Sequence, residues 1–344
     1  MVRLSVLDQS TAVSGRSPDA SIRETLELAK HCEALGYHRF WVSEHHNHDS
    51  IVGTAPEILV AAIAATTRRI QVGSAGVMLP HYSALKVAEQ FRVLEAIAPG
   101  RIDLGLGRAP GGDRRTSFAL NPLADTAADH FPSQVRDLMA WVSGEPLPED
   151  HPFREVRAHP QGPTAPEVWM LGSSNFGAQA AAYFGLPYCF AHFFTDGRGT
   201  EEALAVYAQH YRPSPRHPSP YAALCVWALA ADTEAEARRL FAPREMWRVA
   251  RDRGLLLPLP TPEEARAFTY TEAERARAER MRERAFIGTA EQVGARLREL
   301  AASLGVAELA VVTWSHDPGA RRRSYELLAA EFDLPREETG RTAG

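Results

Sequence analysis

The chain has 344 residues, of which 45% are hydrophobic and 24% are charged, the balance of an ordinary globular protein. Its net charge of -5, with arginines interleaved among acidic residues, argues against nucleic acid as a partner. No apolar run is long enough for a signal peptide or a membrane span, and the three cysteines have no paired spacing. We therefore expect a reduced, cytoplasmic protein.

Along the first third of the chain, short apolar runs of strand length alternate with longer segments of helical periodicity. The predicted strands cover 3–8, 38–43, 70–75 and 101–106. The predicted helices between them cover 18–35, 55–67 and 84–98. This alternation indicates parallel strands that are joined by helical crossovers.

A less regular stretch at 111–165, with one helical piece at 126–142, is interpreted as an insertion, and a second insertion is expected at about 243–285. Strands at 168–171, 188–191, 221–230 and 308–313 complete a set of eight, and helices are predicted at 175–184, 199–211 and 318–332. Another helix begins at Thr289, where Gln292 completes a capping box, and ends at Gly305.

Eight such units predict a closed (β/α)8 TIM barrel with insertions at the carboxyl-terminal face of the strands. We expect one domain over 1–335 and a disordered polar tail over 336–344. In such a barrel the residues just after each strand form the active site, so those segments are the candidates for chemistry.

After the second strand, the residues Glu44-His45-His46-Asn47-His48-Asp49 form a dense polar run. Imidazole and carboxylate groups are suitable ligands for a metal ion. Neighbouring residues of an extended chain point to opposite sides, however, so His45 and His46 do not easily share one ion. The alternatives at this point are a metal site, a set of surface or supporting groups, and a catalytic cluster.

The third and fourth strands end in small residues. Gly73-Ser74-Ala75-Gly76 leaves a flat wall against which a planar ring could lie, or it forms only a tight turn. Gly105-Leu106-Gly107-Arg108 does not match the dinucleotide pattern GxGxxG. Arg108 is either a surface arginine or a cation that binds a phosphate or carboxylate.

The fifth strand is followed by Ser173 and Ser174 at the start of an alanine-rich helix. Unpaired amide groups and the helix dipole at such a start attract a phosphate. Ordinary N-capping by Ser174 or Asn175 explains the same residues.

These motifs together resemble the luciferase-like monooxygenases, and the likeness covers nearly the whole chain in order. The residues that carry it are Phe40 to His46, Gly73 to Gly76 with the downstream Leu79-Pro80 and Ala88-Glu89-Gln90, Gly100 to Arg108, and Leu171 to Pro187. The resemblance implies a flavin-dependent monooxygenase in which reduced FMN, supplied by a separate flavin reductase, reacts with O2. The resulting C4a-hydroperoxide would oxygenate a small organic substrate.

The resemblance also implies roles for single residues. Arg108 would bind the flavin phosphate, together with Ser173, Ser174 and the backbone around Gly177. His45 would be an acid or base near the flavin ring, with Glu44 beside it. The segment Ser74-Ala75-Gly76 would face the ring at a place where many members have a non-proline cis peptide. No metal ion is implied, and the family implies a homodimer or a higher homo-oligomer.

Two departures from the light-emitting members are His192 after the sixth strand and Gly107, where those members have a tryptophan and a cysteine. Light emission is therefore not implied. Two alternatives remain open: an F420-dependent dehydrogenase or reductase on the same barrel, and a non-catalytic FMN-binding protein.

Overall fold

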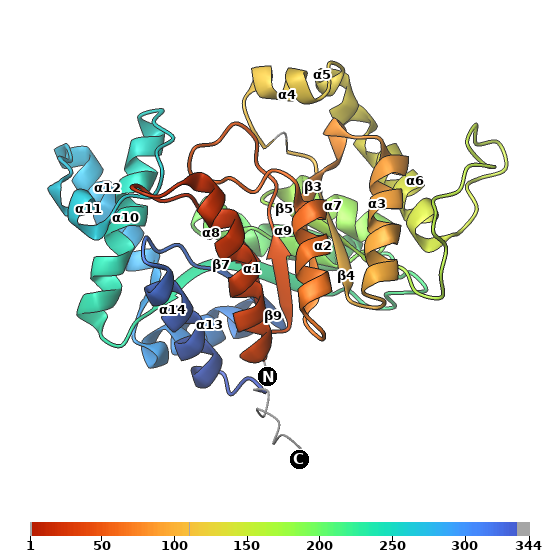
Figure 1. Cartoon of the computed structure of the whole chain (residues 1–344). Helices are drawn as coiled ribbons and strands as arrows, with labels where there is room; N and C mark the ends of the chain where they lie inside the picture. The colour runs from red at the N-terminus through yellow and green to blue at the C-terminus, as the bar shows by residue number, and fades with distance from the viewer. Residues whose placement is uncertain (1, 110, 336–344) are drawn as a thin grey trace, which may run out of the picture. The chain divides into compact units, whose positions relative to one another are not determined.

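The computed structural model of the protein describes residues 2–109 and 111–335, and strands alternate with helices along it (Figure 1). The strands are β1 (Arg3–Asp8), β2 (Arg39–Val42), β3 (Gln71–Met78), β4 (Ile102–Gly107), β5 (Glu167–Gly172), β6 (Tyr188–Phe190), β7 (Ala222–Ala230), β8 (Phe286–Gly288) and β9 (Glu308–Val312). The helices are α1 (Pro18–Ala34), α2 (Pro56–Thr66), α3 (Ala84–Ile97), α4 (Arg114–Leu120), α5 (Ala124–Ala127), α6 (Phe131–Ser143), α7 (Asn175–Phe184), α8 (His192–Thr195), α9 (Thr200–His210), α10 (Glu234–Asp252), α11 (Pro262–Ala267), α12 (Glu272–Arg284), α13 (Ala290–Leu304) and α14 (Pro318–Glu331), with short 3-10 turns at η1 (Leu79–His81) and η2 (Ala128–His130).

The strands β1 to β7 and β9 close into a ring, because β1 pairs with β9 and β6 pairs with β7. Every pairing whose register the structure gives is parallel. The fold is therefore a (β/α)8 barrel, and its eight strands are those that the sequence pattern predicts. The additional strand β8 pairs with the end of β7 outside the ring. Sequence patterning missed β8.

Within the barrel the chain forms two compact units. The first contains residues 2–40, 48–52 and 225–335, and the second contains 41–47 and 53–224 apart from residue 110. The expected single domain over 1–335 stays a prediction. The expected disordered tail at 336–344 lies outside the described residues.

Local helix signals in the sequence are realised in the structure. The side chain of Thr289 accepts a hydrogen bond from the Gln292 amide, and the Gln292 side chain returns one to the Thr289 amide. The same helix ends at Gly305, whose positive φ of 65° favours glycine.

No helix in the described part of the chain combines the length and the apolar character that crossing a membrane requires.

The interior of the second unit contains a buried hydrogen bond between a tryptophan and an aspartate, next to a second tryptophan. The indole N–H of Trp41 on β2 donates to the Asp103 carboxylate on β4 at 2.8 Å. The ring of Trp41 meets the ring of Trp169 on β5 edge to face at 5.0 Å between centroids. A carboxylate can remain buried there because it accepts a hydrogen bond from the indole.

The segment between β4 and β5 is the first predicted insertion, and it contains α4, α5, η2 and α6 rather than one helix. Its end is fixed by the buried Arg92 of α3, whose guanidinium donates to the backbone oxygens of Pro160 and Thr164 at 2.8 Å and of Val142 at 3.2 Å. In the region of the second expected insertion, α10 continues through Pro243 to Asp252, and α11 and α12 follow it before β8. The bounds of that insertion stay a prediction.

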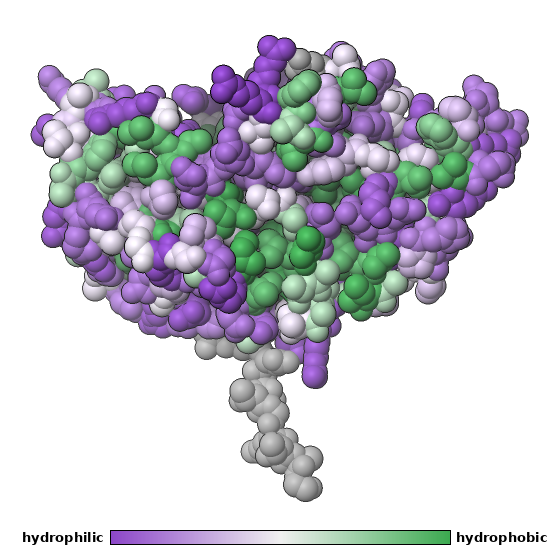
Figure 2. Space-filling model, turned by 45° about the horizontal axis from the view of Figure 1, so that its top comes forward, coloured by the Kyte–Doolittle hydropathy of each residue, from purple (hydrophilic) through white to green (hydrophobic). Residues whose placement is uncertain are grey.

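The helix α2 is apolar apart from Glu57 and Thr66 near its ends, although it lies in the outer layer next to β3 and α3. Its outward residues include Ile58, which is 66% exposed, the exposed Ala65, and the partly exposed Ala61 and Ala62. Hydrophobic residues form patches on the face of the molecule that Figure 2 shows. A helix without a polar face is expected to bury its outward side against another surface.

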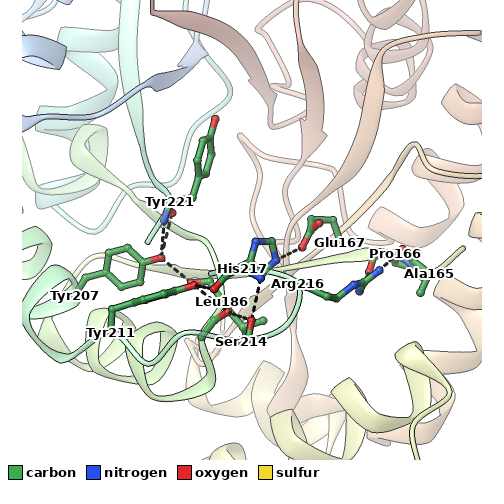
Figure 3. Close-up of polar contacts among 11 residues, drawn as sticks. Ala165, Pro166, Glu167, Leu186, Tyr207, Tyr211, Ser214, Arg216, His217 and Tyr221 are labelled. Carbon is green, nitrogen blue, oxygen red and sulfur yellow. Dashed lines mark hydrogen bonds and ion pairs between the residues drawn. The ribbon is translucent and has the colours of Figure 1, made fainter. Parts of the chain in front are cut away.

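At the amino ends of β5 and β7, side chains fasten the loop over 211–221 (Figure 3). The hydroxyl of Tyr207 on α9 donates to the Leu186 oxygen at 2.8 Å and accepts the Tyr221 amide at 3.1 Å. His217 contacts the carboxylate of Glu167 at 2.7 Å. The bonds of Tyr207 satisfy backbone groups. They lie at the end of the barrel opposite to the expected active site.

We expect Tyr207→Phe to lower the free energy of unfolding by about 1–3 kcal/mol, because buried backbone groups of Leu186 and Tyr221 lose their partner while the ring is kept. Urea denaturation of both proteins measures this difference. Tyr183→Phe is the control, since Tyr183 is exposed. Equal losses in the two variants would contradict the prediction.

Candidate active site at the strand ends

The carboxylate of Glu44, two residues after the end of β2, has three hydrogen-bonding partners at the strand ends. It is 1% exposed. Its Oε1 accepts a hydrogen bond from the Tyr82 hydroxyl at 2.7 Å and lies 2.8 Å from Nε2 of His46. Its Oε2 accepts the backbone N–H of Met78 at 3.1 Å. The side chain predicted as catalytic therefore joins the end of β2 to the end of β3.

Tyr82 and His46 are site residues that the sequence reasoning missed. Residues 44 and 46 are two positions apart, so an extended chain places both side chains on one side, and this alternation was the available signal for His46. Tyr82 had no such signal, since it is brought to Glu44 by the turn η1. Burial and the nearby Glu44 carboxylate raise the pKa of Tyr82 well above its usual value. The phenol therefore stays protonated and acts as the hydrogen-bond donor.

His45 is partly buried, and its backbone N–H donates to the Gly53 oxygen at 3.0 Å. The backbone N–H of His46 donates to the Gly111 oxygen at 3.1 Å, and Asn47 donates to Asp113 at 3.0 Å. The segment after β2 is thus fixed by the loop after β4. The Glu44 carboxylate contacts His46, and the catalytic roles expected for His45 and Glu44 stay predictions.

The wall at the end of β3 consists of Ser74, Ala75 and Gly76. The Ser74 side chain is buried, and its hydroxyl accepts the Gly105 amide and donates to the Gly105 oxygen, both at 3.1 Å. Ser74 can therefore face a ligand only with its backbone. Ala75 and Gly76 are partly exposed, and the peptide between them is cis, as the resemblance implies.

Close approach of β3 and β4 requires glycine at this wall. A Cβ atom on Gly76 would lie 2.6 Å from the Gly105 oxygen, and one on Gly105 would lie 2.2 Å from the Ser74 oxygen. Real Cβ atoms do not approach backbone oxygens so closely. The small residues that the sequence analysis noted are therefore needed for the packing of these two strands as well as for an open wall.

Arg108, just after β4, lies at the amino end of α7. Its guanidinium carbon is 3.8 Å from the centroid of the Phe176 ring, in the first turn of that helix. Ser173 is partly buried and Ser174 is exposed, and the N-cap residue Ser174 makes no side-chain capping bond to the helix. The capping explanation of Ser174 therefore does not hold, and the helix start remains available to another acceptor.

Gly177 lies against the end of β5. A Cβ atom added there would be 3.1 Å from the Cα atom of Gly172 and 3.3 Å from the Leu171 oxygen. This contact brings the first turn of α7 against the strand, so the amide groups of that turn lie at the strand end.

The groups at these strand ends are connected to one another, and we call the carboxyl ends of β2 to β5 with the residues just after them the rim. Met78 is the register partner of Gly107 across β3 and β4, and Met78 is also the backbone donor to Glu44. Gly107 precedes Arg108, which stacks on Phe176. The structure thus brings together Glu44, His46, the wall of β3, Arg108 and the start of α7.

His192 follows β6 and is the first residue of α8. Burial lowers its pKa, and the nearby Asp196 opposes this shift. The imidazole is therefore mainly neutral at neutral pH.

Comparison with known proteins identifies the family of the chain. The sequence matches the Luciferase-like monooxygenase family over residues 2–308. It is 45% identical to the uncharacterised protein YwcH of Bacillus subtilis (strain 168) over 336 residues, which are 96% of this chain and 99% of that protein. It is 35% identical to the N-acetyl-S-alkylcysteine monooxygenase of the same organism, with 96% of this chain and 98% of that protein covered.

Solved structures agree with this result. The structure of apo-MsnO8 has a TM-score of 0.89 and 37% sequence identity, and covers 98% of this chain and 100% of that chain. Two more distant structures share the fold alone. They are the oxygenating constituent of 3,6-diketocamphane monooxygenase from Pseudomonas putida in complex with FMN (TM-score 0.69, 20% identity, 96% and 97% covered) and an F420-dependent secondary alcohol dehydrogenase (0.66, 14%, 98% and 99%). From the family match and the close relatives it follows that this chain belongs to the luciferase-like monooxygenase family.

Proposed function

We propose that this chain is an FMN-dependent monooxygenase that uses reduced FMN and O2 to oxygenate a small organic substrate. The observation that carries the proposal is the position of the Arg108 guanidinium, 3.8 Å from the Phe176 ring in the first turn of α7, a helix whose N-cap side chain makes no capping bond. A cation beside free helix amides is the arrangement that binds a phosphate.

The residues present fit the phosphate end of FMN. Arg108 would donate to the phosphate oxygens from one side, and the first turn of α7 would donate from the other. The exposed Ser174 hydroxyl and the partly buried Ser173 would add donors at the same place. The contact of Gly177 with the end of β5 would keep the helix amides beside Arg108.

The flavin ring would lie along the wall formed by Ala75 and Gly76. Both residues are partly exposed, and neither has a large side chain that would keep a ring away from the backbone. Bound reduced FMN would supply the two electrons for the reduction of O2. The chain itself would orient the ring and limit the access of water to it.

His45 is the proposed acid or base near the ring. It follows the end of β2, and its backbone is fixed by the bond to Gly53. An imidazole can accept and release a proton near neutral pH, which the reduction of O2 requires. Glu44, beside His45 in the chain, would act through its carboxylate, which bonds to His46 and Tyr82.

The function can be tested by titrating the protein with FMN and with F420, and by mixing the complex of photoreduced FMN with O2. We expect FMN to bind more tightly than F420, and the oxidised FMN spectrum to return about tenfold more slowly than with free flavin, because the protein restricts water and protons at the ring. The His45→Ala protein should still bind FMN, but its oxidised FMN spectrum should return sooner than that of the wild-type protein. Preferred binding of F420 would overturn the proposal in favour of a deazaflavin enzyme.

We expect Arg108→Ala to weaken FMN binding by about 1.5–3 kcal/mol, or about 10- to 150-fold, because a charged hydrogen bond to the phosphate is lost. The loss should be much smaller for riboflavin, which has no phosphate. Quenching of flavin fluorescence measures both affinities. Arg212→Ala is a matched control, since Arg212 is also exposed and stacks on an aromatic ring, that of Tyr183 at 4.4 Å. An unchanged FMN affinity would remove Arg108 from the site.

A second copy of the chain is the partner that we propose for the outward face of α2. This helix has no polar face, and the neighbouring helix α3 adds the exposed residues Val93 and Ile97. Alanines on the outward face allow close approach of another helix.

A flavin reductase would be a transient partner that supplies reduced FMN.

We expect light scattering to give twice the 37.8 kDa mass of one chain. Ala62→Glu should yield the monomer, because it buries a charge in the proposed interface. Ala302→Glu on α13 is the control, since Ala302 is exposed and lies on another helix. A wild-type protein that remains monomeric at high concentration would refute the proposed association.

A further inference from the structure

We infer that Tyr82 is a positioning residue of the proposed flavin site, because it holds the Glu44 carboxylate in the place where that carboxylate fixes both the His46 imidazole and the end of β3. We refer to Glu44, His46, Met78 and Tyr82 as the Glu44 unit. The inference rests on the proposed function for its catalytic consequence, but the hydrogen-bonded unit exists without a flavin.

The Glu44 carboxylate is held by hydrogen bonds and has no partner with a permanent positive charge among the described residues. Among the described residues, no lysine or arginine forms an ion pair with it, and His46 is the one partner that can carry a positive charge. A buried carboxylate needs hydrogen bonds to replace its lost water. The Tyr82 hydroxyl supplies the shortest of the three bonds, at 2.7 Å. The raised pKa of Tyr82 supports this donor role, since the phenol stays protonated.

The same carboxylate sets the state of the His46 ring. A carboxylate oxygen can only accept, so Nε2 of His46 must carry the hydrogen of the 2.8 Å bond. In the neutral ring Nδ1 is then the acceptor. The Tyr82 hydroxyl and the His46 ring share the oxygen Oε1, and His81 meets both rings edge to face at centroid distances of 6.2 and 6.3 Å. Loss of the Tyr82 hydroxyl would therefore free Oε1 to move away from His46.

The Glu44 unit is connected to the proposed flavin site on both sides. Through Met78 it holds the end of the strand that carries Ala75 and Gly76. Through Glu44 and His46, the neighbours of His45 in the chain, it fixes the backbone on both sides of the proposed acid or base.

The first insertion also contacts the segment that carries Tyr82. Asn121 donates to the Pro80 oxygen at 2.8 Å, and Gln134 donates to the Tyr82 oxygen at 3.4 Å. The backbone of Tyr82 is therefore held independently of its hydroxyl. Replacing the hydroxyl alone is thus expected to loosen Glu44 while the turn stays in place.

The test compares the wild-type protein, Tyr82→Phe and the control Tyr37→Phe. Tyr82 is partly buried, and Tyr37 is a buried tyrosine whose hydroxyl donates to the Tyr325 oxygen at 2.9 Å. Tyr37 precedes β2, whereas Glu44 follows that strand. Three quantities are measured: the 15N NMR signals of the His46 ring in flavin-free protein at about pH 8.5, the affinity for FMN, and the rate at which oxidised FMN returns after reduced FMN meets O2.

In wild type we expect the His46 signals of a single tautomer with the hydrogen on Nε2. In Tyr82→Phe the two nitrogen signals should move toward each other as both tautomers become populated. FMN affinity should stay within about threefold, while the return of oxidised FMN should become about tenfold faster, because a misplaced group loses its effect on the reaction. Tyr37→Phe should match wild type in all three quantities.

Two results would overturn the inference. One is a wild-type His46 ring that carries its hydrogen on Nδ1 or exchanges between both tautomers. The other is a Tyr82→Phe protein that matches wild type in both the tautomer and the rate. If wild type binds no FMN, the proposed function fails, and the tautomer in flavin-free protein still decides whether the Glu44 unit exists.

Discussion

A buried carboxylate with no lysine or arginine beside it, among the described residues, constrains the geometry at the strand ends. Glu44 accepts hydrogen bonds from a histidine, a tyrosine and a backbone amide. These donors lie in the segment after β2, just after η1, and at the end of β3. Each donor is fixed because the carboxylate cannot be left without partners in a buried position. The segment that bears His45 and the wall at Ala75 and Gly76 are therefore held by the same group.

A second constraint is the close approach of β3, β4 and β5. Gly76 and Gly105 leave no room for a Cβ atom between β3 and β4, and Gly172 and Gly177 bring α7 against the end of β5. Large side chains in these positions would separate the strands and close the wall. Small residues at three successive strand ends thus have one physical cause, which is contact between backbones.

These two constraints support the division of labour in the proposed function. In the proposed function, Arg108 and the start of α7 would bind the anionic end of the cofactor, and the wall of β3 would face its ring. Glu44, His45 and His46 follow β2, which is the neighbour of β3 on the side away from β4. Barrels of this fold hold FMN in one of the similar structures and F420 in another, so the fold does not choose the cofactor and the side chains at the rim must.

The sequence by itself determined the eight barrel strands, most helices and the capping box at Thr289, because these depend on periodicity and on contacts between residues near in the chain. It also located the polar groups at the strand ends, since a parallel barrel collects them on one face. Only the tertiary structure decided that Glu44 bonds to His46 and Tyr82, that the Ser74 hydroxyl is used by Gly105, and that β8 pairs outside the ring. Tyr82 is 38 residues from Glu44, so no local pattern brings these two side chains together. The two-residue spacing of Glu44 and His46 gave a local signal for that contact alone. Such choices are made when the strand ends pack and each buried polar atom takes the nearest partner.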